Sequence, residues 1–272
     1  MTGCKDLDLA RAAAEEAGEI LIKYWKGRGD LVGAQKAPGE FVSEADIAAE
    51  QHLRRRLLAQ CEDGWLGEET GLAPAENGRV WIVDPLDGTT NFLRGVPVWA
   101  VSIALEIDGQ RVMGVVHDPI HGETFAAARG GAVTVNGRPA DVSDTAQLDG
   151  ALFGTGIPFG TLPNIDDHAA EIARLMPHCA GVRRMGAAAL DLAYVAAGRL
   201  DGFWERRLQP WDVAAGLVLL RASGARVEGL DPAEQPEKTG SILAGAPGVF
   251  KPFADLIRSG NVSANPKQAA NR

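Results

Sequence analysis

A chain of 272 residues, 46% of them hydrophobic and 23% charged, has the composition of an ordinary globular protein and suffices for one large domain or two closely joined halves. Its 27 basic and 36 acidic residues give a net charge of -9, which argues against general binding to nucleic acid or to an anionic membrane. Its three cysteines lie far apart without CxxC spacing, which suggests neither a disulfide framework nor a zinc site. No segment approaches the roughly 18 apolar residues of a membrane span or the pattern of an export signal. We therefore expect a soluble cytoplasmic protein.

The chain is predicted to begin with two helices and a loop between them. Apolar residues recur at helical spacing over residues 7–25, and a second helix is predicted to start near Ser43, which with Asp46 matches a capping box. Between the helices, Gly27–Phe41 holds four glycines and a proline without periodicity and is interpreted as a mobile surface loop. Lys36 in this loop is either solvated or a candidate to close over a site.

Strands dominate the rest of the first half. An apolar run ends at Val83, and two longer runs, Val98–Ile107 and Arg111–His117, are joined at Asp108-Gly109, a strong hairpin signal. A further strand pair is predicted within Phe125–Pro139, with turns at its glycines. Residues 1–145 are therefore predicted to form an N-terminal α+β half with mostly antiparallel strands.

The second half, residues 146–272, alternates between strands and helices. Its predicted strands are ALFGTG, VRRM, GFWE and SILAG, and its predicted helices are His168–Met176, GAAALDLAYVAAG and WDVAAGLVLLRASG, the last closed by Gly224. The Asp, Ser and Thr residues near positions 140–150 mark the best internal boundary, and the polar tail from Ser259 is expected to be frayed. The whole chain is predicted to be an α/β (α+β) protein.

The strongest functional signal is WIVDPLDGTTNF, Trp81–Phe92. Asp84 follows an apolar strand at the edge where α/β folds place ligands, and Asp87 comes three residues later. Gly88 allows close approach of the backbone, and the amides of Gly88 to Thr90 would point outward at the start of a helix and form an anion site. Two aspartates and an anion site are thus predicted to share one turn.

Two carboxylates beside an anion would repel each other and the ligand, by roughly 3 kcal/mol for charges about 5 Å apart at an effective dielectric near 20. A divalent metal removes the conflict, and hard oxygen ligands favour Mg²⁺. Further carboxylates are then expected at the ends of elements. Glu68, Glu69, Glu205 and Asp212 fit, although the Glu68-Glu69 pair could be a solvated turn and Asp212 an ordinary acid at a helix N-terminus.

Together, DPLDGTTNF, GEE and WDVAAG make the chain resemble the inositol monophosphatase family of metal-dependent, lithium-sensitive phosphatases, from about Leu9 to Gly248. The resemblance implies a layered αβαβα sugar-phosphatase fold, usually dimeric, in which residues 1–145 carry the metal motifs and residues 146–272 carry the substrate pocket and the last metal ligand. It implies two or three Mg²⁺ ions, one held by Glu68, Asp84 and the carbonyl of Leu86 and another held by Asp84, Asp87 and Asp212.

The resemblance also implies roles in catalysis and substrate binding. Thr89, paired with Asp46, would orient the attacking water beside the metal ligand Glu68. The amides of Gly88 and Thr89 would bind the phosphate. Ala187 stands where the family usually has Ser or Thr, so a polar contact near the substrate is missing. The implied substrate-binding residues are Asp87, Gly88, Thr89, Gly186, Ala187, Ala188, Glu205 and Asp212.

The predicted reaction is the hydrolysis of a small phosphate monoester by direct attack of a metal-activated water, since no Cys or Ser lies beside a basic partner as a covalent nucleophile would. Inositol-1-phosphate is favoured, because Glu205 suits the recognition of hydroxyl groups. Fructose 1,6-bisphosphate, histidinol phosphate and 3′-phosphoadenosine 5′-phosphate are alternatives on the same scaffold, and Arg183-Arg184 could bind a second phosphate. A regulatory binding protein of this fold is the alternative from another class of function, although the complete set of carboxylates argues against binding as the sole role.

Overall fold

The structure, a computed structural model, describes residues 2–27, 34–37, 40–157 and 165–260. Its first layer consists of the helices α1 (Thr2–Lys26) and α2 (Glu44–Leu57). Both predicted helices are confirmed, although α1 begins before the predicted residue 7. The predicted cap of α2 is also present, because Ser43 Oγ accepts a hydrogen bond from Ala45 N at 3.2 Å and Ser43 N donates one to Asp46 Oδ2 at 2.9 Å.

The second layer is an eight-stranded sheet with the strand order β10-β9-β8-β7-β6-β5-β3-β4. Neighbours run antiparallel except β3 and β5, which are parallel, so the prediction of mostly antiparallel strands is confirmed. Its strands are β3 (Gly64–Gly67), β4 (Gly71–Ala73), β5 (Arg79–Asp87), β6 (Ala100–Ile107), β7 (Gln110–Asp118), β8 (Glu123–Ala128), β9 (Thr134–Val135) and β10 (Arg138–Pro139).

Two predicted hairpin turns have the geometry that their sequences favour. Asp108 and Gly109 join β6 to β7 with φ values of 50° and 73°, and Asn136 and Gly137 join β9 to β10 with 52° and 76°. Positive φ at both central residues matches the twist of the flanking strands, and Asn, Asp and Gly adopt it most readily. The local sequence therefore sets the register of both hairpins.

The interpretation of Gly27–Phe41 as a loop is wrong where the structure describes this stretch. β1 (Ala34–Ala37) and β2 (Glu40–Val42) pair as an antiparallel hairpin, and Lys36 lies on β1. β2 lies against the short helix α3 (Thr89–Arg94), so contacts with a distant segment stabilise strands too short to be recognised from their own pattern. Residues 28–33 and 38–39 lie outside the described residues, as does the tail from residue 261 that was predicted to be frayed.

The fourth layer is a five-stranded sheet with the strand order β12-β11-β13-β15-β14. β12, β11 and β13 are parallel, as an alternating α/β segment predicts, whereas β15 runs antiparallel to both β13 and β14. The prediction missed β14, which lies at the edge of this sheet beside β15. The strands are β11 (Leu152–Thr155), β12 (Gly181–Arg183), β13 (Gly202–Glu205), β14 (Arg226–Glu228) and β15 (Ile242–Gly245).

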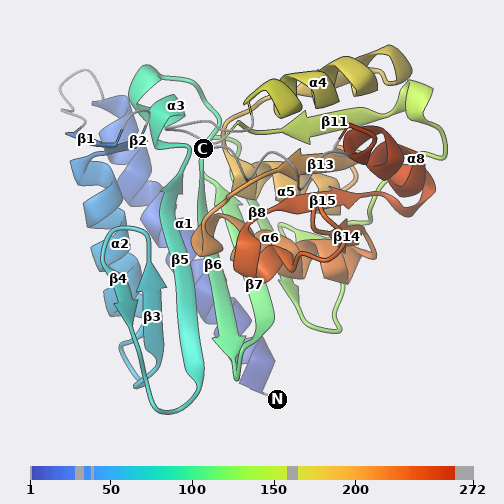
Figure 1. Ribbon diagram of the computed structural model, residues 1–272. Coiled ribbons are helices and arrows are strands. Elements are labelled where there is room, and N and C mark those ends of the chain that lie inside the picture. The colour runs from blue at the N-terminus through green and yellow to red at the C-terminus, as the bar shows by residue number, and fades with distance from the viewer. Residues whose placement is uncertain (1, 28–33, 38–39, 158–164, 261–272) are drawn as a thin grey trace, which may run out of the picture.

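Between the sheets, α5 (Ala188–Ala196) and α6 (Pro210–Ser223) form the third layer (Figure 1). Residues Val213 to Leu220 of α6 are buried all around the helix, as expected for a helix with a sheet on each side. α6 approaches β7 so closely that a Cβ on Gly114 would lie 2.5 Å from the carbonyl oxygen of Ala215. This contact fixes α6, and with it Asp212, against the eight-stranded sheet.

The fifth layer, α4 (Ile165–Leu175) and α8 (Pro247–Arg258), covers the far side of the second sheet (Figure 1). α4 begins earlier than the predicted His168, and the prediction missed α8. The short helix α7 (Pro236–Thr239) and the 3₁₀ turns Leu148–Gly150 and Met176–His178 complete the described elements. The predicted layered αβαβα fold is confirmed, while the division into halves at residue 145 stays a prediction. No helix within the described ranges is long and apolar enough to cross a membrane.

Candidate active site

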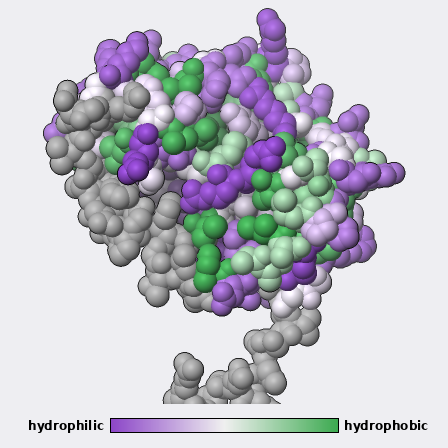
Figure 2. All heavy atoms as spheres, turned by 90° about the horizontal axis from the view of Figure 1, so that it is seen from above, coloured by the Kyte–Doolittle hydropathy of each residue, from purple (hydrophilic) through white to green (hydrophobic). Residues whose placement is uncertain are grey.

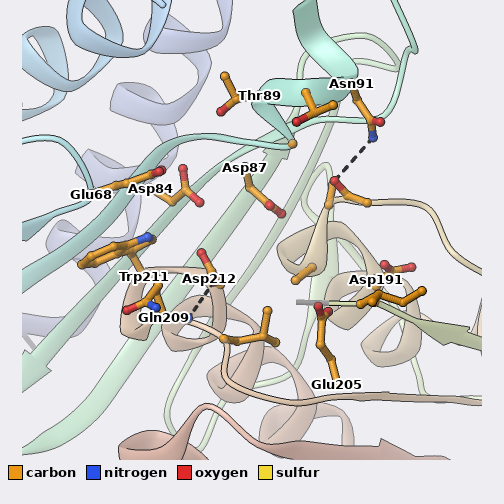
Figure 3. Close-up of a pocket in the computed structure, with 18 of the residues that line it drawn as sticks. Glu68, Asp84, Asp87, Thr89, Asn91, Asp191, Glu205, Gln209, Trp211 and Asp212 are labelled. Atoms are coloured by element: carbon orange, nitrogen blue, oxygen red, sulfur yellow. Dashed lines mark hydrogen bonds between the residues drawn. The ribbon is translucent and has the colours of Figure 1, made fainter. Parts of the chain in front are cut away.

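A pocket of about 380 Å³ opens where the end of β5 meets α5 and the start of α6 (Figure 3). Seen from above, hydrophilic residues are interspersed with hydrophobic ones on this face of the molecule (Figure 2). The pocket brings together residues from both sheets. Those predicted from sequence that line it are Glu68, Asp84, Leu86, Asp87, Gly88, Thr89, Gly186, Ala187, Ala188, Glu205 and Asp212.

The prediction that β5 ends at Asp84 is wrong, because the strand continues to Asp87 and has a bulge after Asp84. Asp84 pairs with Ser102 of β6, and Asp87 pairs with Ala100, so β5 has one residue more than its neighbour over this stretch. The N–H of Leu86 donates to Asp84 Oδ1 at 2.9 Å and closes the bulge. The bulge allows both Asp84 and Asp87 to line the pocket, whereas regular strand residues three apart would point to opposite faces.

Gly88 joins the bulge to α3 and is confirmed as a position that requires glycine. Its φ is 92°, and a Cβ on it would lie 3.0 Å from the carbonyl oxygen of Val98 and 3.3 Å from the Cβ of Ala187. The predicted helix begins at the next residue, Thr89. The backbone of the DGTT turn can therefore face the pocket directly.

Four carboxylates act on one another electrostatically at one end of the pocket. Burial raises the pKa of Asp84 well above its usual range, and the charges of Glu68, Asp87 and Asp212 raise it further. Burial also raises the pKa of Asp87, to about 6, against hydrogen bonds from the backbone at Ala189 and Ala188. The pKa of Asp212 is raised by burial and then by the charge of Asp87. Repulsion between carboxylates thus contributes to the shifts of Asp84 and Asp212, whereas the shift of Asp87 comes from burial.

These carboxylates suit a hard divalent cation by their chemistry, since all four offer oxygen ligands and repel one another without a positive charge between them. The four carboxylates do not themselves form a ready metal site. Within the described ranges, no three acidic, histidine or cysteine side chains lie close enough together to hold a metal ion. The support for a metal is therefore the composition and electrostatics of the pocket. The side chain of Lys36 lies outside the part of the chain that the structure describes.

Thr89 and Asp46 lie together, as expected from the resemblance. Thr89 Oγ1 is 3.0 Å from Asp46 Oδ1 and 3.1 Å from the carbonyl oxygen of Leu86, and its single proton can serve either acceptor. Asp46 is fully buried behind Thr89 and does not line the pocket. Burial raises the pKa of Asp46, while hydrogen bonds from Ser43 and Thr89 oppose the shift.

The other end of the pocket contains a second pair of acids, Glu205 and Asp191 (Figure 3). Burial, and then the charge of Asp191, raise the pKa of Glu205 to about 8. Sequence reasoning missed Asp191, which is 1% exposed and whose Oδ1 has no hydrogen-bond partner in the described part of the chain. A charged residue inside the apolar helix sequence AALDLAYVA was the available signal.

Ala187 lies at the N-cap of α5, where its side chain cannot accept a hydrogen bond. Asp87 caps the helix instead, because its Oδ2 accepts a hydrogen bond from the N–H of Ala189 in the first turn at 2.7 Å. The absence of a hydroxyl at position 187 is thus compensated at the helix end. Towards the pocket it leaves an apolar wall.

The arginines near the pocket divide into different environments. Arg184 lines the pocket, whereas Arg183 does not line it and donates to the carbonyl of Val182. Arg206 also lines the pocket, and its guanidinium is bound to the buried carboxylate of Glu171. The Arg183-Arg184 pair therefore does not face the pocket as one cluster.

A family model described as the inositol monophosphatase family matches residues 5–259. The chain is 41% identical over 254 residues to an inositol-1-monophosphatase of Rhizobium meliloti, covering 93% of this chain and 96% of that protein. It is 40% identical over 259 residues to the Nus factor SuhB of Pseudomonas aeruginosa, covering 93% and 95%. The crystal structure of an extragenic suppressor protein suhB from Bartonella henselae superimposes with a TM-score of 0.89 at 39% identity, covering 93% of this chain and 98% of that one.

Proposed function

The chain belongs to the inositol monophosphatase family and is a phosphoric monoester hydrolase, and we propose that it hydrolyses inositol-1-phosphate with the aid of two or three Mg²⁺ ions. The observation that carries this proposal is the set of four carboxylates beside the glycine turn in one pocket. Glu68, Asp84, Asp87, Asp212 and the carbonyl of Leu86 would hold the ions. Leu86 can do so because a carbonyl oxygen has two lone pairs, of which Thr89 needs at most one.

When bound, divalent ions would neutralise phosphate oxygens and make a water molecule more acidic. The chain itself supplies the positioning. The amides of Gly88 and Thr89 would donate hydrogen bonds to the phosphate at the start of α3. Thr89, whose hydroxyl lies within hydrogen-bond reach of Asp46, would orient the attacking water, and direct hydrolysis needs no covalent nucleophile.

The substrate is proposed to be a small polyol phosphate because of the acids at the far end of the pocket. Glu205, 7% exposed, can bind a hydroxyl group whether it is protonated or ionised, because a protonated carboxyl both donates and accepts. Arg184, Arg206 and Arg207 line the pocket, but Arg206 is bound to Glu171 and Arg183 does not line it, so the Arg183-Arg184 pair does not form a second phosphate site there. Fructose 1,6-bisphosphate, histidinol phosphate and 3′-phosphoadenosine 5′-phosphate remain the competing substrates.

The test is phosphate release by the purified protein from each of these four compounds, with Mg²⁺ and with a chelator. We expect the highest kcat/KM for inositol-1-phosphate, no release with the chelator, and a loss of at least about 10-fold on this substrate in Glu205→Gln. A clear preference for another of the four compounds would replace the proposed substrate and leave the phosphatase class intact.

The family resemblance supports three further proposals: inhibition by Li⁺, a homodimeric assembly and a cytoplasmic location. Size-exclusion chromatography with light scattering would test the assembly, and a Li⁺ titration of phosphate release would test the inhibition. A monomer at micromolar concentration would contradict the dimer without affecting the proposed chemistry.

A second candidate function rests on one observation. The relative from P. aeruginosa is called a Nus factor, and its similarity to this chain equals that of the R. meliloti phosphatase within 1% identity. Binding of a macromolecular partner is therefore a candidate activity beside hydrolysis. Asp84→Asn separates the two functions, because it should abolish hydrolysis and leave a partner-binding surface unchanged.

A further inference from the structure

Glu50 is a buried acid of α2 that is neither a proposed ligand nor a lining residue of the pocket. Its side chain is 1% exposed, and burying an ionised carboxylate is costly unless hydrogen bonds compensate it. Helical spacing places it one turn after Asp46, so both acids point from the same face of α2. A second buried acid on this face needs its own explanation.

Glu50 uses both of its oxygens to hold a single turn. Oε2 accepts a hydrogen bond from the N–H of Glu69 at 2.8 Å, and Oε1 accepts one from the N–H of Thr70 at 2.9 Å. The hydroxyl of Thr70 makes a short hydrogen bond to Oε1 and in turn accepts one from Trp65 Nε1 at 3.0 Å. This carboxylate is thus bound to the backbone of the turn between β3 and β4.

The residue that precedes these two amides is Glu68. Its own N–H donates to the carbonyl of Val83 at 3.2 Å, and Val83 is followed directly by Asp84. The backbone of Glu68 is therefore fixed on one side by β5 and on the other by Glu50. Gly67 belongs to the same arrangement, because a Cβ on it would lie 2.5 Å from Glu50 Oε1.

Asp46 makes the matching contact with the other motif. Asp46 accepts a hydrogen bond from Thr89 Oγ1 at 3.0 Å, and Thr89 lies just after β5. Glu50, one helical turn later on α2, binds the turn after β3. The rise of an α-helix separates two such residues by about 6 Å along its axis. A single helix thus contacts both turns that carry proposed metal and phosphate groups.

We propose that Glu50 is a positioning residue of the metal site, which fixes Glu68 relative to Asp84 and lets α2 set the distance between the Glu68 turn and the Thr89 turn. The inference rests on the proposed function, in which Glu68 and Asp84 share a metal ion. Groups that orient metal ligands typically change metal affinity 10-fold to 100-fold when they are removed. Mg²⁺ binding should therefore weaken more than substrate binding.

Glu50→Gln is the decisive variant. It keeps the size of the side chain, but its amide nitrogen can only donate and would face an N–H of the turn. We expect the Mg²⁺ concentration for half-maximal phosphate release to rise about 10-fold or more, with the KM for inositol-1-phosphate at saturating Mg²⁺ within about 2-fold of wild type. Mg²⁺ should also raise the melting temperature in the absence of substrate, and the variant should need about 10-fold more Mg²⁺ than wild type for the same rise.

Asp63→Asn provides a matched control. Asp63 lies just before β3, as Glu68 lies just after it, and it is a buried acid held by Arg79, Asn77 and Trp81. Its loss should lower the melting temperature without moving the Mg²⁺ midpoint. Thr70→Val is a milder second variant, because it removes the hydroxyl and its hydrogen bonds to Glu50 and Trp65 but keeps the hydrogen bonds from the backbone to Glu50. A midpoint between those of wild type and Glu50→Gln is expected.

Two results would overturn the inference, and they differ from each other. If wild type responds to Mg²⁺ and both Glu50→Gln and Thr70→Val keep the wild-type midpoint while losing thermal stability, Glu50 is a purely structural residue. If wild type itself shows neither Mg²⁺-dependent phosphate release nor a Mg²⁺-dependent melting temperature, the proposed function is wrong and this inference falls with it.

Discussion

The side chain of Asp84 has surroundings that depart strongly from those of an ordinary acid. It is 2% exposed, and three other carboxylates raise its pKa beyond the effect of burial. A protein gains no stability from such an arrangement, because buried like charges oppose folding. Its presence at the bulge of β5 is explained if the pocket normally receives positive charge.

Glu171 shows the opposite behaviour and yields a prediction about acid stability. It is fully buried; burial alone would raise its pKa, but hydrogen bonds from Arg206, His168 and Trp204 and the charge of Arg206 outweigh it and lower the pKa to about 2. Because the pKa in the folded state lies below the ordinary 4.5, this contribution is complete above pH 4.5 and is lost as the pH falls towards 2. Its size is about 3 kcal/mol.

Urea unfolding of wild type and Glu171→Gln between pH 2.5 and 7 would measure this contribution. We expect the variant to be less stable at pH 7 and to lose less stability on acidification, so that the two curves converge near pH 2.5. Parallel curves over the whole range would show that Glu171 is not responsible for the loss.

Among the elements, α3 contacts the second half of the chain through the side chain of Asn91. Its Nδ2 lies 2.8 Å from the carbonyl oxygens of both Val98 and Met185, and Met185 directly precedes Gly186, which lines the pocket. Asn91→Ala should cost about 1–3 kcal/mol of stability, because two part-buried carbonyls lose their donor. It should also raise the KM for substrate, since the phosphate turn and the pocket wall would no longer be held together.

Asn77→Ala is the appropriate control for this prediction. Asn77 lies in the turn before β5, and its Nδ2 donates to Asp63 at 2.8 Å, far from the pocket residues. Equilibrium unfolding would measure the free energy of unfolding of both variants, and steady-state kinetics would measure their KM for substrate. An unchanged KM in Asn91→Ala, with a stability loss equal to that of the control, would reduce Asn91 to a structural role.

The elements that could be predicted are those whose own sequences specify them. The Asp108-Gly109 and Asn136-Gly137 turns and the apolar α6 needed no information from elsewhere. The β1–β2 hairpin and β14 depend on neighbours, and the bulge of β5 depends on its register with β6. The register of β5 on β6, which no tight turn joins, is set by the partner strand, and a local pattern does not contain this information.

The candidate site divides in the same way. Asp84, Asp87 and Asp212 lie in motifs with recognisable spacing, and all of them line one pocket. Glu50 and Asp191 were missed because each lies inside a helix and outside any recognised motif, where an acid is usually solvated. Helical spacing placed both among buried neighbours, so an acid on an apolar helix face was the physical signal.

For the molecule as a whole, the pocket exists only where the two sheets approach each other. Glu68, Asp84 and Asp87 come from the eight-stranded sheet and the segments that follow its strands, whereas Glu205 and Asp212 come from β13 and α6. The acids from both halves repel one another, and the protein carries a net charge of -9. We therefore expect cations to strengthen the association of the halves.

The stability of the metal-free protein should fall as the pH rises. Glu205 and Asp87 have pKa values of about 8 and about 6 in the folded state, above their ordinary 4.5 and 3.8. Groups with raised folded-state pKa values contribute stability that is complete below the ordinary pKa and is lost as the pH passes through the folded value. With a chelator present, the loss should therefore extend over roughly pH 4 to 8.

Thermal unfolding between pH 5 and 8.5, with chelator or with Mg²⁺, would check this expectation. The melting temperature with chelator should decline across the range, and the stabilisation by Mg²⁺ should grow, because deprotonated carboxylates bind the ion better. A melting temperature that rises with pH in the chelator would contradict the assigned directions of the pKa shifts.

The central claim is that the carboxylates around the glycine turn bind Mg²⁺ for phosphate hydrolysis, and the most direct measurement is Mg²⁺-dependent phosphate release from inositol-1-phosphate by Asp84→Asn beside wild type. Asp118→Asn is the control, since Asp118 is also fully buried at the end of a strand but contacts His121 instead of the pocket. We predict that Asp84→Asn remains folded and loses at least about 100-fold in kcat/KM, while Asp118→Asn keeps near-wild-type kinetics. A folded Asp84→Asn variant with a near-normal rate would contradict the metal site.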